Sequence, residues 1–145
     1  MKYLLKFLSI IYSTFIFVPL AILVSTIIFI LIIIMTPIAG ESKWGYYPGR
    51  VLGRIMCTLA LTRVKIIGNE NIDPNKSYIF VANHQSMFDI FLVYGYLNAK
   101  FKWIMKQEIR NTPLLGKACE SMGHIFVDRS SPMRAQKSLE AAKSR

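Results

Sequence analysis

The chain contains only two cysteines and two histidines in 145 residues, and its eight acidic residues are outnumbered by 18 lysines and arginines. Cys57 and Cys119 stand far apart and form neither a C-x-x-C pair nor a zinc-like spacing, so neither a disulfide framework nor a metal site is indicated. We expect both to be reduced, buried thiols, as in a domain that faces the cytoplasm. The chain also lacks internal repeats and low-complexity linkers, and its length allows at most one domain beyond an apolar segment.

Charged residues are missing from the 34 positions between Lys6 and Glu41, where Ile, Leu, Val and Phe dominate. A signal peptide has a much shorter apolar core, so we expect this segment to stay in a membrane. As one helix it would be roughly 51 Å long, against a hydrocarbon core of about 30 Å. It must therefore tilt, kink at Pro19 or lie partly along the membrane interface.

The formal net charge is +10, of which residues 1–40 contribute +2 and the remainder +8. This excess favours an anionic partner. Nucleic acid is not expected, because the basic residues are scattered and form no nucleic-acid motif, and an anionic lipid surface or a phosphorylated lipid is the simpler partner. Basic residues cluster directly after the apolar segment, so the positive-inside rule places the C-terminal domain in the cytoplasm.

Residues 44–61 complete an N-terminal region, 1–61, that we expect to be helical and membrane-anchoring. Trp44 and two tyrosines close behind it suit the headgroup layer of a bilayer. Arg50 and Arg54 fall four residues apart on one helix face, where they would meet lipid phosphates. An ordinary basic, solvated helix face explains the two arginines equally well.

From Thr62 onward, strand patterns alternate with helix patterns, and glycine or proline turns separate them. Strands are expected at 63–67, 78–82, 101–105 and 125–127, and helices at 86–97, at 113–122 and from Pro132. The sequence therefore predicts an α/β domain over 62–145, with a partial, mostly parallel twisted sheet and flanking helices.

The first candidate site is the stretch Asn83-His84-Gln85-Ser86-Met87-Phe88-Asp89, at the expected junction of a strand and a helix. His84 falls in the connecting turn and Asp89 about one helical turn further on. That spacing lets the carboxylate reach one imidazole nitrogen, fixing the tautomer and leaving the other nitrogen to take a proton from a substrate hydroxyl. Alternatively, Asp89 only satisfies backbone N–H groups at the helix start.

The second candidate site is Gly123-His124-Ile125-Phe126-Val127-Asp128-Arg129. Gly123 permits a tight turn into a strand, and Arg129 stands at the strand's C-terminal end, where α/β folds bind ligands. A guanidinium binds phosphate with two hydrogen bonds, so Arg129 is a candidate phosphate ligand, or else a surface arginine paired with Asp128. Strand alternation puts His124 on the opposite face, which favours a structural role.

Two other interpretations use the same residues differently. The first is a basic, membrane-anchored protein that binds anionic lipid without catalysis. The second is a metal site that gathers four side chains of suitable type, although in no known metal-binding spacing: His84, Asp89, His124 and Asp128.

Asn83-His84-Gln85-Ser86-x-x-Asp89, followed about forty residues later by Gly123-x-Ile125-Phe126-Val127-Asp128-Arg129, resembles the first two motifs of the glycerolipid acyltransferase family, specifically the 1-acylglycerol-3-phosphate acyltransferases. Lys106-Gln107-Glu108 and Pro113-Leu114-Leu115-Gly116 are also similar to the family's segment before the second motif. The resemblance covers about residues 60–145, and an N-terminal membrane-associated region is usual in the family.

The resemblance implies transfer of a fatty acyl group from acyl-CoA or acyl carrier protein to the free hydroxyl of lysophosphatidic acid, giving phosphatidic acid. It implies no cofactor and no metal; the acyl thioester is a substrate. His84 would be the general base, Asp89 would orient it, and Arg129 would bind the acceptor's phosphate. The remaining motif residues would shape the substrate site: Asn83, Gln85, Ser86 and Gly123.

The chain departs from the family pattern in one respect. The family's third motif, of the form Phe-Pro-Glu-Gly-Thr-Arg, and a fourth motif should follow the last helix, and the sequence stops at Arg145. We therefore expect an N-terminal fragment of a longer enzyme that lacks later strands and part of the acceptor site.

Overall fold

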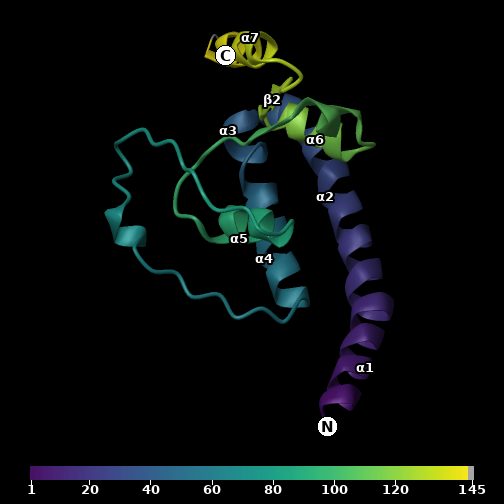
Figure 1. Cartoon of the computed structure of the whole chain (residues 1–145). Coiled ribbons are helices and arrows are strands. Elements are labelled where there is room, and N and C mark those ends of the chain that lie inside the picture. Colours follow the sequence, from purple (N-terminus) through teal and green to yellow (C-terminus); the bar gives the residue numbers. More distant parts are fainter. Residues whose placement is uncertain (144–145) are drawn as a thin grey trace. The chain divides into compact units, whose positions relative to one another are not determined.

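The computed structural model describes residues 1–143 (Figure 1). It divides into two compact units, one made of Met1–Ile28 with Gly49–Ala99, the other of residues 29–48 with those from Lys100 onward. Each unit therefore combines part of the apolar N-terminal region with part of the rest of the chain. The expected boundary between residues 61 and 62 stays a prediction.

The apolar segment forms one continuous helix over Lys2–Ala39, which is long and apolar enough to cross a membrane (Figure 1). It consists of α1 (Lys2–Tyr12), a π-helical segment (Ser13–Phe17) and α2 (Val18–Ala39). Pro19 has no N–H to donate to the preceding turn, so the helix loses a hydrogen bond there. A wider π turn just before the proline is a usual way to accommodate such a defect.

Two helices follow α2 at the place where the sequence predicts one. Gly40 has φ +84°, a left-handed conformation that ends α2, and α3 (Glu41–Trp44) and α4 (Tyr47–Leu59) come next. α4 is amphipathic as predicted, and its buried side includes Leu52 and Met56. The helix begins later and ends earlier than the predicted 44–61.

In the first unit, α4 packs against α5 (Phe88–Tyr96). The contact includes Gly53 and Gly95, both buried, where the two backbones approach closely. The hydroxyl of Tyr12 donates a hydrogen bond to the carbonyl oxygen of Leu59 at 2.7 Å, so α1 satisfies an open carbonyl at the C-terminal end of α4. α5 also begins two residues later than predicted, after Met87.

The predicted strands at 63–67 and 78–82 are wrong. Figure 1 shows residues 60–87 as an irregular loop, with one short 3₁₀ turn at Asn69–Asn71. Ile79 and Val81 are 90% and 91% exposed rather than buried. A strand needs a neighbour to satisfy its backbone groups, and within the described residues the sheet contains only two strands, both from the second unit.

The second unit carries that sheet, formed by β1 (Ile104–Lys106) and β2 (Ile125–Val127). The strands are parallel, with Ile104 opposite Ile125. A 3₁₀ segment (Gln107–Asn111) and α6 (Leu115–Ser121) connect the two strands, and α7 (Pro132–Lys143) follows β2. The α/β class with a partial parallel sheet is confirmed. The strand at 125–127 lies where predicted, while β1 is shifted toward the C-terminus relative to 101–105.

Candidate active site

His84 and Asp89 lie together in the first unit, as their spacing predicts. Nδ1 of the imidazole is 3.2 Å from Oδ2 of the carboxylate. α5 fixes the carboxylate, because Asp89 occupies its first turn. His84 lies in the turn that leads into the helix, so the two side chains meet across five residues of chain.

Two backbone groups hold the same oxygen of Asp89. The backbone N–H groups of Gln85 and Ser86 donate to Oδ2 at 2.8 Å and 2.9 Å. These two hydrogen bonds, from Ser86 first and then Gln85, lower the pKa of Asp89, and the neighbouring His84 lowers it further. Asp89 is therefore an ionised hydrogen-bond acceptor at neutral pH.

An ionised carboxylate can only accept a hydrogen bond, so Nδ1 of the neutral His84 imidazole must be the donor. Nε2 then carries the lone pair. The His84 side chain is 58% exposed, and the pair is arranged like a base and its orienting carboxylate.

The other residues of the first motif contribute through their backbones. Besides the two N–H groups given by Gln85 and Ser86, the hydroxyl of Ser86 accepts a hydrogen bond from the N–H of Phe88 at 3.1 Å. The carboxylate of Asp89 reaches back to the N–H of Ser86, as in a capping box, but the Ser86 hydroxyl accepts from a residue one position earlier than in that motif. Asn83 is exposed beside them. The sequence predicts that Asp89 either orients His84 or accepts from backbone N–H groups at the helix start, and in the structure its carboxylate contacts both His84 and the N–H groups of Gln85 and Ser86.

Gly123 lies in the second unit, where it has φ +72° just before β2. This left-handed conformation confirms the tight turn that the sequence predicts. A β carbon at this position would come within 2.8 Å of Nζ of Lys102. Lys102 in turn donates to the carbonyl oxygen of Met122 and to Oε2 of Glu41. The ion pair of Lys102 and Glu41 therefore fills the space that a side chain at position 123 would need.

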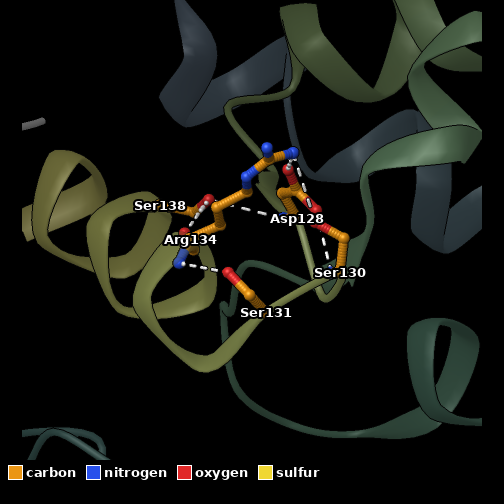
Figure 2. A network of polar contacts seen from close by, with 5 residues as sticks. All are labelled: Asp128, Ser130, Ser131, Arg134 and Ser138. Carbon is orange, nitrogen blue, oxygen red and sulfur yellow. Dashed lines mark hydrogen bonds and ion pairs between the residues drawn. The ribbon is translucent and has the colours of Figure 1, made fainter.

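Arg129 is exposed one residue after Asp128, beyond the end of β2. Figure 2 shows that Asp128 belongs to a separate polar network: it accepts from the N–H of Ser130 at 2.9 Å and pairs with Arg134 at 3.5 Å. Contacts from Ser130 and, more weakly, Arg134 lower the pKa of Asp128. No ion pair joins Arg129 to Asp128 in the described residues, so the predicted pairing is wrong, although Arg129 is exposed as a surface arginine would be.

α7 begins directly after this turn. Ser131 precedes Pro132, and its hydroxyl accepts a hydrogen bond from the N–H of Arg134 at 3.3 Å, as a helix N-cap does (Figure 2). Proline at the first helical position is typical of a helix start. Arg129 therefore stands between the end of a strand, where α/β folds bind ligands, and a helix N-terminus, which favours anions.

His124 is buried, with 3% of its surface exposed, which agrees with the predicted structural role. Its Nδ1 accepts a hydrogen bond from the backbone N–H of Trp103 at 3.3 Å. Burial, and then the charge of Lys102, lower the pKa of His124 to about 4. The imidazole is therefore neutral at physiological pH.

The remaining candidates are the two arginines of α4 and the two cysteines. Arg54 donates from Nε to the carbonyl oxygen of Gly95 at 3.0 Å, which satisfies an open carbonyl at the end of α5. Arg50 is partly buried. Cys57 and Cys119 are buried, as predicted, and burial raises the pKa of Cys119 to about 11. Residues 1–143 contain no group of three or more His, Cys, Asp or Glu side chains able to hold a metal ion.

Comparison with known proteins bears on this arrangement. The family model described as Acyltransferase matches residues 63–145, more than half of the chain and both motifs. The chain belongs to the acyltransferase family. The resemblance to glycerolipid acyltransferases is thereby confirmed.

Several curated acyltransferases are similar to this chain. A 1-acyl-sn-glycerol-3-phosphate acyltransferase of Cocos nucifera is 32% identical over 124 residues, covering 83% of this chain and 39% of the relative. A 1-acyl-sn-glycerol-3-phosphate acyltransferase of Saccharomyces cerevisiae is 30% identical over 103 residues, covering 71% of this chain and 34% of the relative. A third, from Helicobacter pylori, is 32% identical over 89 residues, covering 61% of this chain and 37% of the relative.

These acyltransferases are considerably longer than the chain, which spans between 34% and 39% of their length. No solved structure gives a significant match. The two motifs of this acyltransferase chain fall in different units: His84 and Asp89 in the first, Gly123 and Arg129 in the second.

Proposed function

We propose that the chain provides the general base and part of the acceptor site of a 1-acylglycerol-3-phosphate acyltransferase. The observation that carries this proposal is the pair formed by His84 and Asp89, with Nδ1 and Oδ2 3.2 Å apart. The names of the similar proteins supply the substrate class: an acyl group is transferred to 1-acyl-sn-glycerol-3-phosphate.

In the proposed reaction, Nε2 of His84 removes the proton from the free hydroxyl of the acceptor. The hydroxyl oxygen attacks the carbonyl carbon of the thioester, and a C–O bond forms. The C–S bond then breaks, and the departing thiolate takes the proton back from the imidazolium. The products are phosphatidic acid and a free thiol, with no acyl-enzyme, and the donor is acyl-CoA or acyl carrier protein.

Asp89 has two roles in this reaction. Its hydrogen bond keeps the proton of the neutral imidazole on Nδ1, so Nε2 faces the acceptor. Its negative charge stabilises the imidazolium that forms when the acceptor is deprotonated. The two backbone N–H groups on the same oxygen hold the carboxylate in place and keep it ionised.

The acceptor's phosphate is assigned to Arg129. A guanidinium forms two parallel hydrogen bonds with a phosphate, and the adjacent N-terminus of α7 adds a partial positive charge. Asp128 does not compete for this guanidinium, because its ion-pair partner is Arg134. Gly123 keeps the turn before β2 free of a side chain.

The long helix, which is apolar enough to cross a membrane, supports a site at the membrane, where the lysophospholipid acceptor resides. We propose that residues 1–61 anchor the chain and that residues 62–145 carry the catalytic part on the cytoplasmic face. Clustered basic residues directly after the apolar segment support that orientation.

The proposal is tested by expressing the complete gene product in membranes and measuring phosphatidic acid formed from lysophosphatidic acid and an acyl thioester. His84→Ala should lower the rate by roughly 10²–10⁴-fold, the usual contribution of a general base. The amount of protein in the membrane fraction should not change. A variant with normal turnover would remove His84 from the reaction, and a wild type that binds anionic lipid without turnover would favour the non-catalytic alternative.

A further inference from the structure

The second unit contains a hollow at the point where the chain leaves the apolar helix. α2 ends at Ala39, Gly40 turns the chain, and α3 follows at once. The segment from Lys100 to Trp103 lies against this turn, and Lys102 pairs with Glu41 at 3.3 Å. The hollow encloses about 360 Å³ and is lined by Glu41, Gly45, Tyr46, Lys100, Phe101 and Lys102.

Aromatic rings form its walls. Tyr46 is buried, and its ring meets that of Phe101 edge-on with the centroids 6.3 Å apart. Phe101 meets Trp103 in the same way at 5.1 Å. Tyrosine and tryptophan, such as Tyr46 and Trp103, are typical of the layer where the hydrocarbon of a membrane gives way to headgroups. Their position directly after a helix able to span a membrane therefore indicates an interfacial site.

The charge of the hollow is positive. Glu41 is paired with Lys102, which also donates to the carbonyl oxygen of Met122. Lys100 lies over the ring of Tyr47, with its ammonium 5.5 Å from the ring centre, and has no ion pair within the described residues. An ammonium has three N–H donors, and the face of a ring engages one of them. Lys100 thus retains donors for an anion.

We propose that this hollow binds the phosphate of an anionic phospholipid from the bilayer that contains α2. The phosphate accepts hydrogen bonds from Lys100, the aromatic walls enclose the glycerol, and the acyl chains run along α2. Exposed apolar side chains are available there: Ile34 and Ile38 are 55% and 75% exposed and four residues apart on the helix. This lipid is a component of the membrane and is independent of the acyl-transfer reaction.

The only two tryptophans of the chain, Trp44 and Trp103, make the site observable. Trp103 contacts the wall residue Phe101, and Trp44 precedes Gly45 in the lining. The full chain is reconstituted in vesicles of phosphatidylcholine with a minority of phosphatidylglycerol. Bromine atoms, which quench nearby indoles, are placed near the glycerol end of the acyl chains of one lipid at a time.

Brominated phosphatidylglycerol should quench about fivefold more per mole than brominated phosphatidylcholine, the enrichment expected of one lysine near an anionic lipid. Lys100→Gln should abolish the preference, and Lys100→Arg, which keeps the charge, should retain it. Lys117→Gln is the matched control, because it removes an exposed lysine of α6 outside the hollow.

Three results would overturn the proposal. Equal quenching by the two lipids in the wild-type chain would mean that the hollow does not select an anionic headgroup. Equal losses in Lys117→Gln and Lys100→Gln would show only a general effect of surface charge. Selective quenching by brominated lysophosphatidic acid, and none by phosphatidylglycerol, would make the hollow a substrate site instead.

Discussion

The backbone of Gly95 in α5 lies where a side chain on Gly53 of α4 would have to begin. A β carbon on Gly53 would stand 2.8 Å from the amide nitrogen of Gly95 and 2.6 Å from the carbonyl oxygen of Phe91. In the reverse direction, a β carbon on Gly95 would stand 3.0 Å from the amide nitrogen of Arg54. The two helices therefore touch backbone to backbone, and this contact positions the helix that carries Asp89.

Replacing Gly53 with valine should force α4 and α5 apart and lower the free energy of unfolding. Overpacking of this kind costs about 1–3 kcal/mol, and backbone atoms cannot move aside as a flexible side chain does. Thermal unfolding in detergent measures the loss. Val51→Leu is the control, because it adds bulk to the exposed side of the same helix, and an equal loss there would refute a specific contact at Gly53.

Asp89→Asn should reduce acyl transfer by roughly a hundredfold or more, within the range of acid–base catalysis. The amide keeps an acceptor oxygen for the backbone N–H groups, but it lacks the charge that stabilises imidazolium. Asp73→Asn is the matched control, because Asp73 also accepts a backbone hydrogen bond, from Asn75 at 2.9 Å, outside the pair. Comparable losses in both variants, measured as initial rates, would argue for a purely structural carboxylate.

Arg129→Lys should raise the Michaelis constant for the acceptor while leaving the dependence on the acyl donor nearly constant. Lysine keeps the charge and loses the two-pronged geometry, so a roughly tenfold or larger drop in kcat/KM for the acceptor is expected. Arg134→Lys provides the comparison, since Arg134 pairs with Asp128. It should lower thermal stability and spare acceptor binding. An unaltered acceptor dependence in Arg129→Lys would remove Arg129 from the site.

Acid should destabilise the second unit through His124. Its pKa is about 4 in the folded chain, below the ordinary value of 6.5. Between these values the unfolded chain binds a proton that the folded chain does not, so stability falls as the pH drops from about 6.5 to 4. The full loss is roughly 3 kcal/mol.

Thermal unfolding across this pH range, compared between the wild type and His124→Gln, measures the effect. The variant should lose this part of the acid sensitivity, and His84→Gln, which removes the exposed histidine, should keep it. Parallel pH curves for wild type and His124→Gln would show that the buried imidazole is not responsible.

The sequence predicted the features that depend on neighbouring residues. The starts of α5, predicted two residues early, and of α7 at Pro132, the turn at Gly123 and the pair formed by His84 and Asp89 all depend on contacts within a few residues. Local sequence preferences decide such contacts, so periodicity and capping patterns locate them to within about two residues.

Features that depend on distant residues were missed. The segment 78–82 has a strand-like composition, but a strand forms only when another strand pairs with it, and none does in the described part of the chain. The close approach of Gly53 and Gly95 was also not predicted, because the sequence of neither helix shows which of its faces contacts the other helix. The charged pair of Lys102 and Glu41 is likewise a contact across 61 positions.

The hydrogen bonds to Asp89 have a consequence for folding. All three donors, on His84, Gln85 and Ser86, lie within five residues of the carboxylate. Closing a loop of about ten residues takes roughly 10–100 ns, far less than the time in which distant segments find one another. The base and its orienting carboxylate are therefore expected to meet among the earliest contacts of the chain, before α5 docks on α4, and to reform quickly after each local opening.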